Sequence, residues 1–102
     1  MPSPAYLPLD LCEAYVPLAR KLGVSEVARS RAGFMGQYRR AQGDPNRLND
    51  WWAQRRDNFV ARHMAQVKAR KEPLWRDGMP TRRHLALIMW AYSPTPRRLE
   101  RL

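Results

Sequence analysis

Cysteine is almost absent from this chain of 102 residues, in which Cys12 is the single example. One thiol cannot form a disulfide within the chain, and no Cys/His spacing matches a zinc site. Because Cys12 stands in a row of apolar residues, the sequence predicts a small core residue rather than a nucleophile. We expect no cofactor and no metal.

Long apolar runs and alternating apolar–polar runs are also missing. No apolar stretch approaches the roughly 18 residues of a membrane-spanning helix, and no period-two run of useful length predicts a β-sheet. The first ten residues lack the charged and apolar regions of a signal peptide. We therefore expect an intracellular, cytoplasmic protein with no membrane partner.

The patterns that carry catalysis are equally scarce. The sequence has no Gly-rich phosphate loop, no paired carboxylates and no serine-based triad. Its nine acidic residues are scattered singly, which predicts no metal cluster. We expect no enzymatic activity from these patterns.

Positive charge is what the chain has in excess. Nineteen Lys and Arg stand against nine Asp and Glu, for a net charge of +10, and sixteen of the nineteen bases are Arg. A GC-rich genome would also favour Arg over Lys, but codon bias does not explain the net charge. Such a field attracts phosphate polyanions, and the guanidinium fork grips phosphate well. Nucleic acid, either DNA or RNA, is the predicted partner, and an acidic protein is the alternative.

The length predicts one domain, which we expect to be all-α with four to five helices. A long central helix is predicted at about residues 50–71, where apolar residues recur at helical spacing. A buried helix is predicted at about 81–92, because that stretch is apolar nearly all round. Residues 1–9 form a Pro-rich arm, 10–93 the helical domain and 94–102 a basic, frayed tail.

Local signals predict where the first helices begin and end. Asp10 and Glu13 match a capping box at a helix start, and Pro17 predicts a kink or a fresh start. Gly23 is placed to end the second helix in the left-handed conformation. A break or an unusually close backbone contact is expected near Gly33.

Residues 18–31 resemble a helix-turn-helix, with Ala19 in the first helix, Leu22-Gly23-Val24 through the turn and Ser25 as the cap of the second helix. That resemblance implies DNA contacts from residues 26–31, including Arg29 and Arg31. The pattern departs from the family at Arg29, where an apolar residue normally packs the second helix, although Val27 could substitute. An ordinary helix–glycine–helix corner remains the alternative.

Two further stretches combine bases with features that suit phosphate. Thr81 caps a predicted helix whose first residues are Arg82 and Arg83, although cations are unfavourable at that end. A bound anion would remove this conflict, and ion pairs with Asp77, Glu72 or Asp57 would do the same.

The pair Trp51-Trp52 lies beside Arg55 and Arg56, a mixture of aromatic and basic residues that suits single-stranded nucleic acid. Adjacent helix residues point about 100° apart, so one indole should face the core and the other solvent. Trp52 is the predicted core residue. Trp51 is a candidate for base stacking or for contact with a protein partner.

Arg56-Asp57 and His63 also resemble the Arg–polar–(six residues)–His pattern of HEPN ribonucleases. That resemblance implies a metal-independent RNA cleavage in which His63 acts as acid or base and Arg56 binds phosphate. An ordinary core histidine on the apolar stripe is the other interpretation of His63.

These observations favour a small, basic nucleic-acid-binding protein that acts through Arg–phosphate contacts, with the helix-turn-helix as a degenerate element. A basic protein-interaction or assembly module is the alternative, and the ribonuclease is a third. No family is recognised across the whole chain, and the oligomeric state is left open. The predicted nucleic-acid contacts are Arg29, Arg31, Arg39, Arg40, Arg55, Arg56, Arg62, Arg82 and Arg83.

Overall fold

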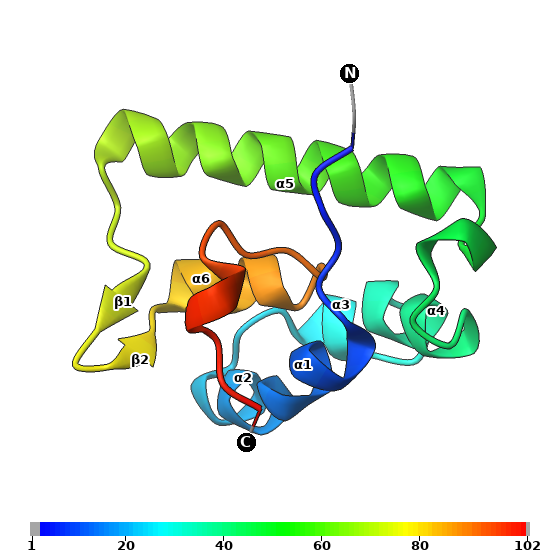
Figure 1. Cartoon of the computed structure of the whole chain (residues 1–102), viewed down its shortest axis with the longest axis horizontal. Helices are drawn as coiled ribbons and strands as arrows, with labels where there is room; N and C mark the ends of the chain where they lie inside the picture. The colour runs from blue at the N-terminus through cyan, green and yellow to red at the C-terminus, as the bar shows by residue number, and fades with distance from the viewer. Residues whose placement is uncertain (1–2, 102) are drawn as a thin grey trace.

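A single long helix, α5 (Asp50–Arg70), lies along one side of the molecule, and the other helices lie beneath it (Figure 1). The computed structural model describes residues 3–101. The side chain of Asn49 caps α5 by accepting a hydrogen bond from the Trp52 N–H at 2.9 Å. The helix ends at Arg70, and Lys71 follows it with a left-handed φ of 51°. The predicted helix at 50–71 therefore corresponds to α5, which occupies an edge of the fold rather than its centre.

Four short helices make up the first half of the chain: α1 (Leu9–Ala14), α2 (Val16–Leu22), α3 (Glu26–Arg29) and α4 (Phe34–Arg40). Pro17 lies in the first turn of α2, so α2 is a fresh start rather than a continuation of α1. Gly23 ends α2 with a φ of 67°, as the sequence predicts. A 3₁₀ turn, η1 (Pro45–Arg47), then leads to α5.

The breaks at Pro17 and near Gly33 raise the helix count above the predicted four to five. Residues 3–101 contain six α-helices and two 3₁₀ turns, and α3 is a single turn. A β-carbon on Gly33 would lie 2.0 Å from the Val27 carbonyl oxygen, and one on Gly36 would lie 2.0 Å from that of Arg31. The close backbone contact expected near Gly33 is therefore present.

A small β-hairpin replaces the loop predicted after α5. Strand β1 (Trp75–Arg76) pairs antiparallel with β2 (Met79–Pro80), and Trp75 lies opposite Pro80. Asp77 and Gly78 form the predicted tight turn, with φ of 52° and 77°. The expectation of no sheet is corrected here, because two-residue strands are too short to produce an alternating pattern.

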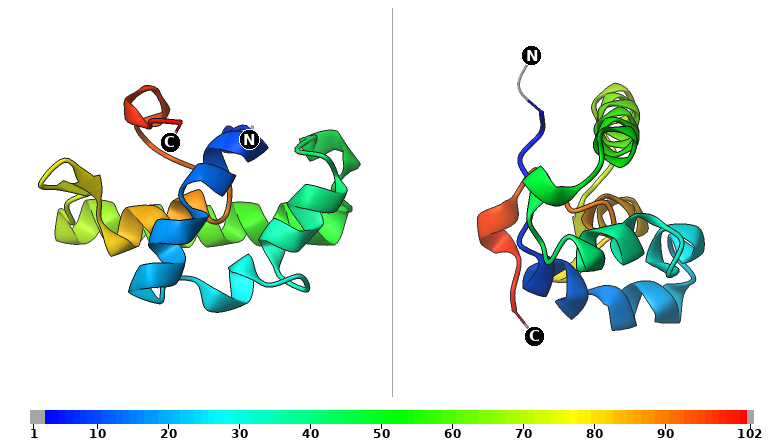
Figure 2. Two further views of the ribbon diagram at one scale, coloured as in Figure 1. Left: turned by 90° about the horizontal axis from the view of Figure 1, so that it is seen from below. Right: turned by 90° about the vertical axis from the view of Figure 1, so that its right-hand side faces the viewer.

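Helix α6 (Arg82–Ile88) supplies the centre of the core. Its Leu85, Leu87 and Ile88 are fully buried. The helix contacts both α5 and α2, and Figure 2 shows it between the layer of α5 and the layer that holds α2. The burial confirms the apolar pattern, although the helix ends at Ile88 rather than at residue 92. Ala91 has a φ of 58°, which the helix cannot continue through.

Two predicted caps are absent. Pro8 precedes α1, and Asp10 and Glu13 bond elsewhere: Asp10 accepts from Arg101 at 2.8 Å, and Glu13 pairs with Arg39 at 2.7 Å. Ser25 has a left-handed φ of 55° and makes no capping hydrogen bond to α3. At both positions the residue types are those of a helix cap, but the backbone does not adopt the capping geometry.

The C-terminal segment is packed rather than frayed. It forms a second 3₁₀ turn, η2 (Pro96–Arg98), and Leu99 is only 9% exposed within the core cluster. The Glu100 N–H donates a hydrogen bond to the Tyr15 hydroxyl at 2.9 Å. Within residues 3–101 no helix combines the length and the apolar character needed to cross a bilayer.

Candidate nucleic-acid interface

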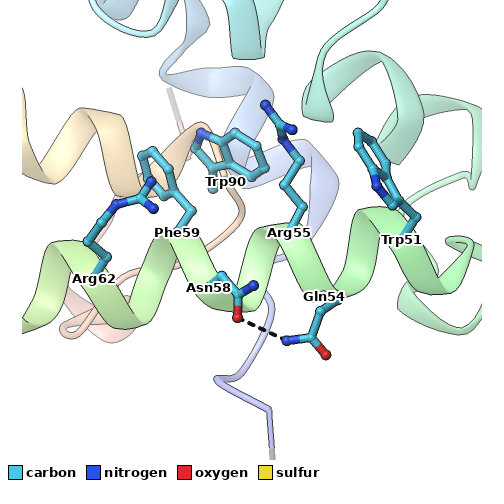
Figure 3. Close-up of a pocket in the computed structure, with 7 residues that line it drawn as sticks. All are labelled: Trp51, Gln54, Arg55, Asn58, Phe59, Arg62 and Trp90. Atoms are coloured by element: carbon cyan, nitrogen blue, oxygen red, sulfur yellow. Dashed lines mark hydrogen bonds between the residues drawn. The ribbon is translucent and has the colours of Figure 1, made fainter.

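A groove of about 440 Å³ follows one face of α5 (Figure 3). Most of its lining residues recur every three or four positions, so they share one side of the helix. The lining carries two guanidinium groups and no carboxylate. It consists of Trp51, Gln54, Arg55, Asn58, Phe59 and Arg62 from α5, and of Trp90 from just beyond α6.

Trp51 is the exposed aromatic residue of this groove, which we call the α5 groove. Its side chain is 60% exposed, whereas Trp52 packs against the core. The two indoles meet edge to face, with centroids 4.8 Å apart and planes at 87°. The predicted division of the pair is therefore confirmed: Trp52 faces inward and holds Trp51 in place at the surface.

The floor of the α5 groove belongs to a continuous stack of rings. Phe34 stacks on Trp90 at 5.1 Å, Trp90 on Phe59 at 4.6 Å, and Phe59 on His63 at 3.9 Å between centroids. Offset stacking of aromatic rings stabilises such contacts beyond the area they bury. The floor is consequently fixed to the core from α4 through to α5.

Arg55 and Arg62 place positive charge at either side of the ring stack. The guanidinium carbon of Arg55 lies 5.1 Å from the Trp51 centroid, and that of Arg62 lies 6.0 Å from the Phe59 centroid. Both distances lie within cation–π range. Both side chains are exposed, and neither forms an ion pair within residues 3–101.

Two smaller hollows are each lined by one residue of α5 and by residues of other elements. One, of about 180 Å³, includes Arg40 and Arg47 beside Trp52. The other, of about 380 Å³, includes Arg82 and Arg83 beside His63. Because Trp52 follows Trp51 and His63 follows Arg62 in α5, the three hollows follow one another along the length of the helix, although neighbouring residues point about 100° apart. We call this surface the arginine track. Its bases are Arg40, Arg47, Arg55, Arg62, Arg82 and Arg83.

Five of the nine predicted contact residues thus lie on the arginine track: Arg40, Arg55, Arg62, Arg82 and Arg83. Arg82 donates a hydrogen bond to the Leu22 carbonyl oxygen. Arg83 forms an ion pair with Glu72 at 2.8 Å and contacts the His63 Nδ1 at 2.6 Å. The pairing with Glu72 is one of the alternatives that the sequence left open for Arg82 and Arg83.

The prediction that Arg56 contacts nucleic acid is wrong, because its side chain is fully buried. Its guanidinium group donates to the carbonyl oxygens of Trp90 and Ala91 at 3.0 and 2.9 Å, and to those of Pro4 and Ala5. Asp57 completes the arrangement at 3.0 Å. A buried charge needs such partners. Every donor is in use within the fold, so Arg56 has a structural role.

The same burial removes the phosphate ligand that the ribonuclease resemblance requires. His63 contacts Arg83 rather than Arg56, and it stacks on Phe59. Partial burial, followed by the charges of Arg83 and Arg62, lowers the pKa of His63. The geometry of Arg56 therefore gives the ribonuclease reading no support.

The helix-turn-helix segment keeps its turn but lacks a long second helix. Helix α3 is four residues long, and Ala28 is its buried residue. Val27, the proposed packing residue, is 78% exposed. Arg29 bends back to donate to the Val24 carbonyl oxygen at 2.8 Å, whereas Arg31 is exposed beyond the end of the helix. Arg39 is engaged with Glu13.

Two other titratable groups are part of the core. Burial raises the pKa of Cys12 to about 12, which agrees with its predicted role as an inert core residue. His84 is fully buried, with Nδ1 2.9 Å from the Leu74 carbonyl oxygen and Nε2 2.8 Å from Ser93 Oγ. Neither group lines the arginine track.

Sequence reasoning missed several residues of the track: Arg47, Gln54, Asn58, Phe59 and Trp90. The positions 51, 55, 58 and 62 follow helical spacing, so this second face of α5 was readable beside the apolar stripe. Trp90 and Arg47 lie in other elements, and only the fold brings them to α5.

Comparison with known proteins gives no relative. No protein-family model matches the chain, and neither the curated proteins nor the solved structures provide a significant match. The function must therefore be inferred from the geometry alone.

Proposed function

We propose that this is a small nucleic-acid-binding protein that contacts phosphates through the arginine track. The observation that carries the proposal is the alternation of guanidinium and aromatic groups along one face of α5, in a groove without a carboxylate. Stacking faces combined with phosphate neutralisation are the features that nucleic-acid-binding grooves share.

The balance of ion pairs supports the same proposal. Five of the nineteen bases form ion pairs within residues 3–101, through Arg39, Arg47, Arg56, Arg83 and Arg101. Fourteen bases remain, opposed by the four acidic residues that are not in those pairs. The net charge of +10 is thus a property of the accessible surface and is available to a polyanion.

The proposal is tested by fluorescence anisotropy titrations against single-stranded DNA, duplex DNA and RNA of one sequence. We expect micromolar or tighter binding that weakens steeply as salt rises from about 50 to 200 mM, because bound counterions are released. The double variant Arg55→Ala/Arg62→Ala should bind more weakly. Binding no better than millimolar at low salt would refute the proposal.

A matched control comes from α2, on the opposite side of α6 from α5 (Figure 1). Arg20 and Lys21 are exposed and form no ion pair within the described residues. The variant Arg20→Ala/Lys21→Ala removes the same two charges and should affect binding much less. If both double variants lose affinity equally, the contact surface is diffuse and the track has no special part in binding.

The exposed indole of Trp51 also suits the alternative, an acidic protein partner. Aromatic residues and arginines are common among the energetically dominant residues of protein interfaces. Purification of the protein at low and at high salt distinguishes the two functions. Nucleic acid that co-purifies at low salt raises the ratio of the absorbance at 260 nm to that at 280 nm. A pull-down would follow if no nucleic acid is bound.

A further inference from the structure

We infer that the α5 groove takes single-stranded nucleic acid, with a nucleobase stacked on Trp51 and the neighbouring phosphates on Arg55 and Arg62. This inference rests on the proposed function and specifies its ligand. Three features support it: the exposure of the Trp51 ring, the position of Arg55 beside that ring, and the shortness of α3.

The accessible ring is the first observation. Base stacking needs an aromatic ring that is open to solvent and held still. Trp51 is 60% exposed, and its ring meets that of Trp52 edge to face with centroids 4.8 Å apart. Trp52 is tied to the core through contacts with Phe34 and Trp90, at 6.5 and 6.2 Å between centroids. The indole is therefore positioned before the ligand arrives, which lowers the ordering cost of binding.

A base in an intact duplex cannot use this ring. The two faces of a paired base are covered by the neighbouring base pairs, whereas unpaired bases splay out and stack on aromatic side chains of proteins. A nucleobase on Trp51 must come from a single strand, a loop or an end. The Arg55 guanidinium lies over the Trp51 ring, 5.1 Å from its centroid. A base that stacks on that side would displace the guanidinium from the ring toward the neighbouring phosphate.

Polar groups for the edge of a base also line the α5 groove. Gln54 donates its amide N–H to the Asn58 side-chain oxygen at 2.9 Å, and both side chains are exposed (Figure 3). This bond leaves the Gln54 oxygen and the Asn58 amide hydrogens able to bond a ligand. Amides pair with base edges as both donors and acceptors. Gln54 and Asn58 would therefore add hydrogen bonds to an unpaired base, which binding to the phosphates of a duplex does not require.

The segment that resembles a helix-turn-helix is poorly suited to reading a duplex. A major groove admits an α-helix that protrudes from the protein body. The resemblance to a helix-turn-helix assigned this role to residues 26–31, but α3 has only four residues, or about 6 Å of helix. The lining of the α5 groove is a hollow rather than a ridge. Duplex contacts from this segment and from the α5 groove should therefore be mainly to the phosphates.

The test compares the wild type with Trp51→Ala and Trp51→Phe on a labelled single strand and on the duplex of the same sequence. We expect the wild type to prefer the single strand by about five- to 150-fold, the range that loss of one stacked base typically costs. Trp51→Ala should lose most of that preference, and Trp51→Phe should keep much of it. Duplex affinity should change little in either variant.

The control variant is Met79→Ala, because Met79 is an apolar residue of the hairpin that is 47% exposed and does not line the α5 groove. None of the three variants changes the net charge. Unfolding midpoints equal to that of the wild type would show that the fold is intact. A second readout is tryptophan fluorescence, which should be quenched by the single strand in the wild type and much less in Trp51→Phe.

The outcomes separate the two proposals. Salt-sensitive binding with equal affinity for single strand and duplex, or with no effect of Trp51→Ala, would overturn the stacking inference and leave the proposed function in place. Absence of binding to every nucleic acid would overturn both.

Discussion

The guanidinium carbon of Arg56 lies 3.7 Å from the centroid of the Tyr6 ring. Arg56 comes from the middle of α5, and Tyr6 comes from the N-terminal arm, which crosses α5 in Figure 1. The same guanidinium bonds the carbonyl oxygens of Pro4 and Ala5 and those of Trp90 and Ala91. One buried cation thus joins the arm, α5 and the segment just beyond α6.

Removal of this cation should destabilise the fold. Arg56→Ala leaves several buried carbonyl oxygens without donors, so we expect the free energy of unfolding to fall by about 3–5 kcal/mol. Arg56→Lys keeps the charge but loses the planar fork, and should still destabilise. Urea unfolding measures both effects. Arg40→Ala, at an exposed position, should leave the midpoint almost unchanged. Equal midpoints for Arg56→Ala and Arg40→Ala would show that the described bonds contribute nothing.

Gly36 provides a test in which helix propensity and packing predict opposite signs. It lies within α4, where replacement by Ala would ordinarily stabilise a helix by close to 1 kcal/mol. A β-carbon there would lie 2.0 Å from the Arg31 carbonyl oxygen, so the backbone must shift. We therefore expect Gly36→Ala to destabilise by about 1–3 kcal/mol in chemical denaturation. A gain in stability would contradict the close approach of the two segments.

The buried imidazole of His84 should make stability depend on pH. Burial lowers the pKa of His84 below 6.5; the bond to the Leu74 carbonyl opposes this, and the charge of Arg98 adds to it. The unfolded chain then binds a proton that the native state does not, so stability is present above about pH 6.5 and declines as pH falls below it. His63, whose pKa is also lowered, acts in the same direction.

Urea midpoints between about pH 5 and 7.5 measure this decline, in a range that avoids most carboxylate titration. His84→Gln should flatten the dependence, even if it lowers stability at every pH. An unchanged slope in His84→Gln would mean that the histidine titrates equally in the folded and unfolded chain.

The C-terminal segment should contribute to stability through Leu99. This side chain is 9% exposed and belongs to the core cluster, so Leu99→Ala should destabilise by about 2 kcal/mol. Leu22→Ala serves as the control, because Leu22 is 38% exposed. Thermal unfolding should show a clear decrease in Tm for the first variant only. Equal Tm values would indicate a segment that does not pack in solution.

The sequence was most informative where one pattern dominates a long stretch. The apolar stripe of α5 and the nearly all-apolar α6 could be predicted from periodicity, as could the turns at Gly23 and at Asp77-Gly78. The hairpin could not, because strands of two residues carry no period. The cap predicted at Asp10 failed because α1 begins at Leu9, so Asp10 lies within the helix, and its carboxylate accepts a hydrogen bond from Arg101, far away in the sequence.

Arginines were the hardest residues to assign from sequence. Sixteen of them look alike in composition, yet Arg56 is buried, Arg39 pairs with Glu13, and Arg55 stays at the surface. A signal for Arg56 did exist, since it stands one helical turn before the buried Val60 on the same stripe. No pattern could place Arg47 or Trp90 beside α5, because those contacts depend on how the chain folds back.

The most direct test of the account is the salt dependence of nucleic-acid binding in the wild type and in the two charge-matched double variants. About six neutralised phosphates predict a log–log slope near −4 for a single strand and near −5 for a duplex. Arg55→Ala/Arg62→Ala should reduce the magnitude of that slope by about one to two, and Arg20→Ala/Lys21→Ala should leave it nearly unchanged. A slope near zero, or the same reduction in both variants, would contradict the claim that the arginine track binds the phosphates.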